Sequence, residues 1–227
     1  MPHGVRLPQN FLHDLRRLGY TDAMQDIAIL IPAAGASRRM RGKDKLLQEI
    51  DGVPLLRRQV ERALASHAHV LVTLPDYDHP RADILAGLPV QLVAVPDADQ
   101  GMSASLRRGI TLLPPGMLAV IVLPGDMPDL ETEDIQHLIK AFRDNFCRTL
   151  HRATTEDGVP GHPVLFPADC FPALQQLTGD EGARQVVQAN KNRLRLVKLP
   201  GDRALIDLDT PEAWDAWRAR QSTQEPA

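Results

Sequence analysis

The chain has 227 residues and a formal net charge of −3 at pH 7. A chain of this length commonly forms one domain around one core, and the acidic balance argues against an extended nucleic-acid groove. No apolar run approaches the roughly 20 residues of a membrane-spanning helix, so we expect neither nucleic acid nor a membrane as a partner. Cys147 and Cys170 lack metal-ligand spacing and are interpreted as reduced thiols of a cytoplasmic protein.

Residues 1–25 form an N-terminal extension ahead of the first predicted strand. They contain no continuous apolar segment, so a secretory signal is not expected. Apolar side chains at helical spacing indicate a short amphipathic helix suited to packing or dimer contact: Phe11, Leu12, Leu15 and Leu18.

Strand and helix patterns alternate along the rest of the chain. Apolar, β-branched segments predict strands at residues 27–31, 70–74, 90–95 and 119–123, followed by shorter ones at 148–153, 164–166 and 194–198. Helical spacing occurs at residues 53–63, 102–113 and 135–142. This rhythm predicts an α/β fold, a single-domain Rossmann-like three-layer sandwich with a mostly parallel mixed sheet.

The last helix has a marked start, with Thr210 suited to the N-cap and Pro211 to the first helical position. Residues 222–227 then form a polar tail that we expect to fray.

The segment after the first strand combines small residues with basic ones. Pro32 ends the strand, and five residues follow whose backbone N–H groups can approach an anion: Ala33, Ala34, Gly35, Ala36 and Ser37. Basic side chains supply the counter-charge: Arg38, Arg39, Arg41, Lys43 and Lys45. We interpret this order as a triphosphate cradle in which Gly35 is free to adopt a positive φ. The alternative is a solvated basic loop after an ordinary strand.

Two common phosphate loops do not match this segment. The Walker loop places four residues between its first Gly and its Gly-Lys pair, whereas residues 36–41 separate Gly35 from Gly42 here. Asp44 stands where the Walker hydroxyl would be, and no G-x-G-x-x-G follows an apolar run.

Acidic residues lie where the sheet and the last helix predict a ligand site. Asp126 follows the apolar run 119–123, and Asp207 and Asp209 lie just before the helix that begins at Thr210. Ligands of open α/β sheets bind beyond the carboxyl ends of the strands, and Mg²⁺ prefers oxygen ligands. These carboxylates therefore suit a magnesium site, although Asp126 could be a turn residue and Asp209 an accessory cap.

Several fragments, in one order over residues 27–218, resemble the molybdenum-cofactor cytidylyltransferase-like branch of the nucleotidyltransferases with an A/GT-A-type fold. The fragments are Ala33-Ala34-Gly35-x-Ser37-x-Arg39-Met40, Lys45-Leu46-Leu47, Gly52-x-Pro54-Leu55-Leu56, Gly101-Met102-Ser103-x-Ser105-Leu106, Leu123-x-x-Asp126-Met127-Pro128, Gly161-His162-Pro163, Gly179-Asp180-Glu181-Gly182-Ala183-Arg184 and Asp207-x-Asp209-Thr210-Pro211. The loop departs from the pattern by one extra residue between Met40 and Lys45.

The resemblance implies a nucleotidyltransferase domain at residues 26–221 and a role for each group of site residues. Asp126 and Asp209 are the expected metal ligands, with Asp207 in reserve. Arg39 is expected to bind pyrophosphate and Lys45 the reacting phosphates, so the expected catalytic residues are Arg39, Lys45 and Asp126. Ser103 and Ser105 open a helix that the resemblance places by the base and ribose, although simple capping would also explain them.

Two polar, glycine-bearing loops are candidates for the acceptor side. Their candidate residues are Gly161, His162, Asp180 and Glu181. A purely structural role for His162 remains the alternative.

The resemblance implies a magnesium-dependent enzyme that moves CMP from CTP to the molybdopterin cofactor, a phosphorylated small molecule, and releases pyrophosphate. The Ala33-Ala34-Gly35 form is closer to the CTP-using branch than to the GTP-using one. The resemblance also suggests a molybdoenzyme or its chaperone as a protein partner. Two alternatives stay open: a sibling enzyme acting on a sugar or polyol phosphate, and a non-catalytic nucleotide-binding or cofactor-delivery protein.

Overall fold

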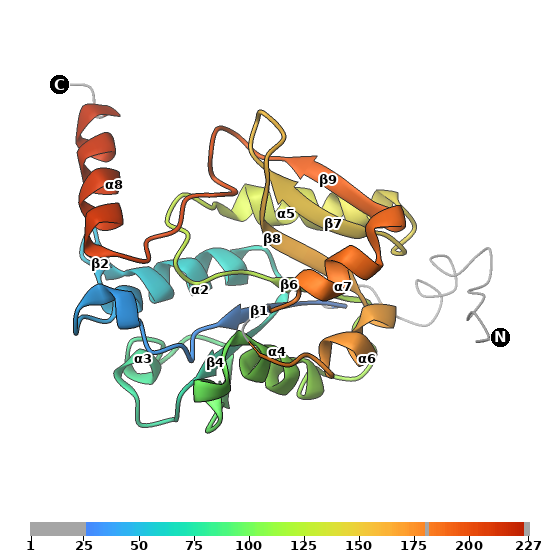
Figure 1. Ribbon diagram of the computed structural model, residues 1–227, viewed down its shortest axis with the longest axis horizontal. Coiled ribbons are helices and arrows are strands. Elements are labelled where there is room, and N and C mark those ends of the chain that lie inside the picture. Colours follow the sequence, from blue (N-terminus) through green and yellow to red (C-terminus); the bar gives the residue numbers. More distant parts are fainter. Residues whose placement is uncertain (1–25, 180–181, 225–227) are drawn as a thin grey trace.

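The computed structural model describes residues 26–179 and 182–224. The amphipathic helix expected within residues 1–25 lies outside the described residues, as do the acceptor candidates Asp180 and Glu181. Helices cover both faces of a seven-stranded sheet (Figure 1), which confirms the predicted α/β sandwich. None of the helices in the described ranges is long and apolar enough to cross a membrane.

The sheet has the strand order β5-β4-β1-β6-β8-β7-β9. Its strands are β1 (Ile27–Pro32), β4 (His69–Leu74), β5 (Gln91–Ala94), β6 (Ala119–Val122), β7 (Leu150–Thr154), β8 (Pro160–Pro167) and β9 (Leu194–Lys198). The first four run parallel, β8 is antiparallel to both β6 and β7, and β9 is parallel to β7. The carboxyl ends of β4, β1 and β6 therefore meet at one edge, where ligands of such sheets bind.

Helices lie on both faces of this sheet, and the C-terminal helix stands apart from it and packs in a separate cluster (Figure 1). They are α2 (Leu55–Ala65), α3 (Pro80–Asp83), α4 (Met102–Thr111), α5 (Thr132–Asp144), α6 (Phe171–Leu174), α7 (Arg184–Ala189) and α8 (Pro211–Gln224). Short 3₁₀ turns η1 (Arg38–Met40) and η2 (Lys45–Leu47) and a small hairpin, β2 (Glu49–Ile50) and β3 (Val53–Pro54), connect β1 to α2.

Strand β1 shows why the chain needs both layers. Its alternate side chains Ile29 and Ile31 belong to the core cluster that includes Val60 of α2, whereas Leu30 belongs to the opposite cluster with Leu106 of α4. A strand that is apolar on both faces must be covered on both, as the continuous apolar run predicted.

The C-terminal segment returns to the end of the sheet where the phosphate loop begins. Trp214 and Trp217 pack in one cluster with Met40 and Leu55. The N–H of Leu208 donates to the backbone oxygen of Asp126 at 3.0 Å. These contacts bring a segment from the end of the chain beside the carboxyl end of β6.

Helix α8 begins as the sequence predicted. The Thr210 hydroxyl oxygen accepts a hydrogen bond from the N–H of Ala213 at 3.2 Å, and Pro211 is the first helical residue. The helix continues to Gln224, so residues 222–224 of the predicted tail are helical.

Candidate active site

The phosphate loop leaves the end of β1 with its backbone N–H groups largely unused. The N–H of Ala33 donates to the backbone oxygen of Thr73 at 2.9 Å. Within the part of the chain that the structure describes, no acceptor is recorded for the N–H groups of residues 34–37. Gly35 is exposed, and no atom lies within 4 Å of the position its Cβ would take. The loop can therefore offer N–H donors to an anion.

The sharp bend in this loop lies at a different residue from the one expected. Gly35 is not among the residues with positive φ, whereas Ser37 has φ 49° and Arg41 has φ 54°. The freedom of Gly35 to adopt a positive φ is therefore not used in this structure. Its missing side chain keeps the loop surface open instead.

Two cations and two carboxylates meet beside the loop. Lys45 Nζ contacts Asp126 Oδ2 and lies 2.5 Å from Asp209 Oδ1, while Arg39 Nη2 lies 2.5 Å from Asp209 Oδ2. Burial opposes the charge on Lys45, but the two carboxylates outweigh it and raise the pKa of the ammonium above its ordinary value. The predicted catalytic residues and metal ligands thus lie together, although they come from three distant parts of the sequence.

Asp207 adds negative charge to the same place. Burial raises the pKa of its carboxyl, and the nearby charges of Asp209 and Asp126 raise it further. No group of three or more metal-binding side chains is found among the described residues. The pair Asp126 and Asp209, drawn together on one cation, fits the usual Mg²⁺ site of one or two carboxylates completed by substrate phosphates and water.

The remaining basic residues of the loop lie away from this cluster. Arg41 pairs with Glu212 at 2.5 Å on the surface, and Arg38 and Lys43 are exposed. The extra loop residue therefore leaves Lys45, and not Lys43, beside the carboxylates.

The structure also reveals a residue that the sequence analysis missed. Arg81 in α3 is 2% exposed and binds Asp44 together with the backbone oxygens of Ala33 and Gly35. Its neighbours in sequence form no recognisable motif, so only the fold could place this side chain under the loop.

The two serines of α4 point into the protein. Ser103 is fully buried and its hydroxyl donates to the backbone oxygen of Gly179 at 2.5 Å, while Ser105 is 4% exposed. The contact of Ser103 holds the loop before α7 against α4. Their role in binding the nucleotide stays a prediction.

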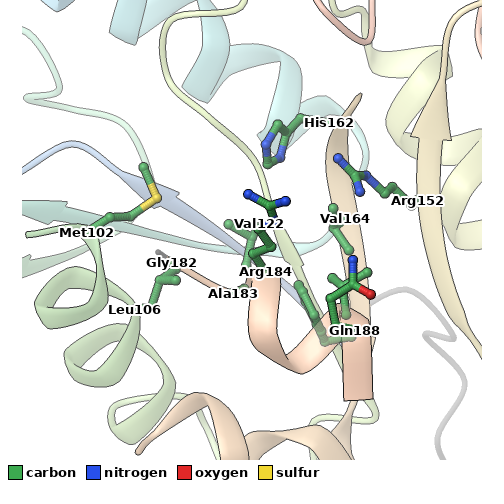
Figure 2. Close-up of a pocket in the computed structure, with 12 residues that line it drawn as sticks. Met102, Leu106, Val122, Arg152, His162, Val164, Gly182, Ala183, Arg184 and Gln188 are labelled. Atoms are coloured by element: carbon green, nitrogen blue, oxygen red, sulfur yellow. The ribbon is translucent and has the colours of Figure 1, made fainter. Parts of the chain in front are cut away.

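A pocket of about 430 Å³ lies between the sheet, α4 and α7. Figure 2 shows that Arg152 of β7, His162 of β8 and Arg184 of α7 point into this space, below which lie apolar side chains such as Val122 and Val164. Burial and the charge of Arg152 lower the pKa of His162, and Asp126 opposes them. The charge of Asp126 therefore acts on a histidine that lines this pocket.

The candidate acceptor residues of this region have different surroundings. Gly161 packs so tightly that an added Cβ would lie 1.9 Å from the backbone oxygen of Ala204. Close packing therefore explains why position 161 is a glycine. Arg152 Nε donates to the Gly161 oxygen at 2.9 Å, and burial and the charge of Arg184 lower the pKa of Arg152. Neither Arg152 nor Arg184 was expected from the sequence to bind a ligand, because β7 and α7 meet only in the fold.

An open, mostly parallel sheet binds its ligands beyond the carboxyl ends of its strands, and at that edge this chain carries the loop of open N–H groups and the paired carboxylates. The chain belongs to the family described as the MobA-like NTP transferase domain, whose model matches residues 29–195.

Named relatives cover nearly the whole domain. The chain is 27% identical to the purine catabolism protein PucB of Bacillus subtilis (84% of this chain, 95% of the relative). It is 29% identical to a probable molybdenum cofactor guanylyltransferase of Natronomonas pharaonis (85% and 96%) and 23% identical to the molybdenum cofactor cytidylyltransferase of Escherichia coli (83% and 94%).

A solved structure supports the same fold. The homologue of Mycobacterium tuberculosis Rv0371c from Mycobacterium sp. strain JC1 superposes with a TM-score of 0.77, at 24% identity over 89% of this chain and 100% of that one. The likeness shows that the three-layer arrangement is shared.

Proposed function

We propose that this protein transfers CMP from CTP to the molybdopterin cofactor in the cytoplasm, with release of pyrophosphate and dependence on Mg²⁺. The observation that carries the proposal is the meeting of Lys45 and Arg39 with Asp126 and Asp209 beside a loop of open N–H groups. Such a site can hold a triphosphate and neutralise the charge that develops during transfer.

In this reaction an oxygen of the acceptor phosphate attacks the α-phosphorus of the nucleotide. The bond between that phosphorus and the oxygen bridging to the β-phosphate breaks, and the electron pair leaves with pyrophosphate. The N–H groups of residues 34–37 would bind the phosphates, and the guanidinium of Arg39 would hold the leaving pyrophosphate through paired hydrogen bonds. Lys45 would exchange one of its carboxylate contacts for a reacting phosphate oxygen.

Asp126 and Asp209 would hold Mg²⁺, which supplies positive charge to the phosphate oxygens when bound. Asp207 remains the reserve ligand: burial raises the pKa of its carboxyl, and the charges of Asp209 and Asp126 act on it as well.

The acceptor would occupy the pocket next to Asp126. Arg152 and Arg184 would meet its negative charge, and His162, on which the charges of Arg152 and Asp126 both act, lines the same pocket. The apolar wall formed by residues such as Val122 and Phe166 suits the face of a ring system. A phosphorylated pterin has both features. Its delivery would require a molybdoenzyme or its chaperone as the next partner.

CTP is favoured by the Ala33-Ala34-Gly35 loop, since the GTP-using branch has a more glycine-rich form at this place. The named relatives include both a cytidylyltransferase and a guanylyltransferase. The choice of base is therefore the part of the proposal that most needs measurement.

The test combines nucleotide and acceptor in a panel. Purified protein with Mg²⁺ is given CTP, GTP or ATP and, as acceptor, molybdopterin, a sugar 1-phosphate or a polyol phosphate, and pyrophosphate release is followed. We expect efficient release only with CTP and molybdopterin, and greater thermal protection by magnesium-CTP than by magnesium-GTP at equal concentration. Turnover with a sugar or polyol phosphate alone would transfer the enzyme to the sibling class. Nucleotide binding without turnover on any acceptor would favour a cofactor-delivery protein.

A further inference from the structure

Arg81 is a charged side chain enclosed under the phosphate loop. Its Nη1 donates to the backbone oxygens of Ala33 at 2.6 Å and Gly35 at 2.8 Å. Its Nη2 donates to Ser37 Oγ at 3.0 Å and to Asp44 Oδ1 at 2.8 Å, and its Nε donates to Asp44 Oδ2 at 2.8 Å. Every N–H of the guanidinium therefore has an acceptor in this small region.

We propose that Arg81 is the positioning residue of the nucleotide site, fixing both the phosphate loop and Lys45 before the nucleotide arrives. The inference rests on the proposed nucleotide chemistry of that loop. Arg81 itself touches no substrate in this proposal, because its donors are already occupied and its side chain is 2% exposed.

The geometry of the peptide bond links the oxygens that Arg81 binds to the direction of the loop N–H groups. In a trans peptide the C=O of one residue and the N–H of the next point in opposite directions. When Arg81 holds the oxygens of Ala33 and Gly35 on its own side, the N–H groups of Ala34 and Ala36 are turned to the other side. These are N–H groups for which the described part of the chain records no acceptor.

Arg81 is also linked to Lys45, through Asp44. Asp44 receives two hydrogen bonds from Arg81, and its Oδ1 also accepts the N–H of Leu46 at 3.0 Å. Asp44 is thus the N-cap of the 3₁₀ turn that starts at Lys45. Arg81, which binds the phosphate loop, therefore also fixes the start of the turn that carries Lys45, because it binds the N-cap residue of that turn.

Electrostatics maintain this arrangement. Burial alone would raise the pKa of Asp44, but hydrogen bonding and the charge of Arg81 lower it below its ordinary value. Asp44 is consequently ionised at neutral pH, and the ion pair persists under the conditions of nucleotide transfer.

The effect of this ion pair on the shape of the loop can be tested separately from its effect on the stability of the fold. Removing one partner strands a buried charge and destabilises a protein, whereas replacing both partners with apolar side chains is often neutral or stabilising. The double variant Arg81→Met/Asp44→Leu should therefore remain folded while the loop loses its fixed shape. Arg81→Lys keeps one charge but cannot hold Asp44 and both backbone oxygens together.

The experiment measures binding of magnesium-CTP, magnesium-GTP and magnesium-ATP by calorimetry and the melting temperature of each variant. Arg193→Met is the matched control, because Arg193 likewise binds a carboxylate (Asp169, 2.7 Å) and a backbone oxygen (Arg148, 3.0 Å) but lies at the other end of the sheet. We expect the double variant and Arg81→Lys to bind the preferred nucleotide about 10–100-fold more weakly, and Arg193→Met to bind as wild type. In turnover, KM for the nucleotide should rise while KM for the acceptor stays within about twofold.

If the double variant and Arg81→Lys bind the nucleotide as tightly as Arg193→Met does, Arg81 has no positioning role. Unfolding of both Arg81 variants would overturn it too, since Arg81 would then serve the fold and not the site. If wild-type protein binds none of the three nucleotides, the proposed function fails and this inference with it. Binding by wild type that the variants leave unchanged refutes the inference alone.

Discussion

Lys45 lies between two carboxylates that come from the middle and the end of the sequence. Asp126 follows β6 and Asp209 precedes α8, yet both contact the same ammonium group. Lys45 is shared by both carboxylates, and Arg39 also binds Asp209. A metal-bound triphosphate can enter this site if its phosphates take over the contacts of the cations and its metal takes over those of the carboxylates.

Asp126→Ala should abolish most turnover and leave the fold intact. The side chain contacts Lys45 and supplies no apolar packing, so its loss removes a proposed metal ligand without opening the core. We expect kcat/KM to fall by more than about 100-fold with little change in melting temperature. Asp144→Ala, which removes an exposed acid paired with Lys140 at 2.5 Å, is the control. Near-normal pyrophosphate release from Asp126→Ala would refute its assignment.

Lys45→Ala should lower kcat/KM by about 10²–10³, the usual cost of losing one preorganised charge contact in a site. Lys43→Ala should cost far less, because Lys43 is exposed, and of the two lysines it is Lys45 that contacts the carboxylates. Initial rates at several nucleotide concentrations would establish the ranking. The reverse order would show that the loop changes its register when the nucleotide binds.

Arg152→Gln and Arg184→Gln should weaken acceptor binding and spare nucleotide binding. Each loses a cation that faces the pocket, and a hydrogen bond to a charged group contributes about 1.5–3 kcal/mol, or about 10–100-fold in affinity. KM for the acceptor and Kd for the nucleotide would be measured separately. Arg195→Gln, an exposed arginine of β9, is the control. If both pocket variants keep the wild-type KM for the acceptor, the proposal that the acceptor binds in this pocket is wrong.

At the scale of elements, the position of the site depends on how strands meet the segments that cross them. Strand β8 begins against residues 200–206, where the N–H of His162 donates to the backbone oxygen of Ala204 at 2.8 Å. This contact fixes the position of the His162 backbone beside the pocket. It is possible only because the residue before His162 is a glycine.

Gly161→Ala should therefore destabilise the protein. The new Cβ would lie 1.9 Å from a backbone oxygen that cannot rotate away, so the strand or the crossing segment must shift. Overpacking of this kind commonly costs about 1–3 kcal/mol, visible as a lower melting temperature. Gly35→Ala is the matched variant with no atom within 4 Å of the new Cβ, and its melting temperature should stay near that of wild type. Equal melting temperatures would refute the packing argument.

At the scale of the whole molecule, a buried histidine links stability to pH. His151 is fully buried beside Phe142, and burial followed by the charge of Arg195 lowers its pKa from 6.5 to about 4. The folded protein must therefore keep His151 neutral, whereas the unfolded chain binds a proton below about pH 6.5. The free energy of unfolding should decrease as pH falls from about 6.5 towards 4, by an amount of the order of 3 kcal/mol. His162 acts in the same direction, since its pKa is also lowered.

Denaturant unfolding at several pH values between 4 and 7 would measure this effect. His151→Leu should show a shallower dependence, because an apolar side chain there binds no proton in either state. His137→Leu is the comparison, since His137 is exposed on α5. An identical pH dependence in wild type and His151→Leu would refute the assignment of this residue.

The amino-acid sequence by itself determined the order of strands and helices and the loop that follows β1. Apolar alternation and helical spacing are local properties, so they located β1, β4, β6, α2 and α5 to within a few residues. The start of α8 was equally local, because a hydroxyl cap and a proline act on the backbone next to them. The small residues at 33–37 and Asp126 after β6 indicated nucleotide chemistry, because these patterns too can be recognised from a short stretch of sequence.

Only the tertiary structure decided which side chains meet. Arg81 reaches the phosphate loop because β4 pairs with β1, and Arg184 of α7 lines one pocket with Arg152 of β7 because the fold brings these elements together. The conformation of Ser37 depends likewise on partners outside its own segment, including Arg81. Contacts between residues distant in the sequence are selected by the packing of whole layers, and no local pattern records them.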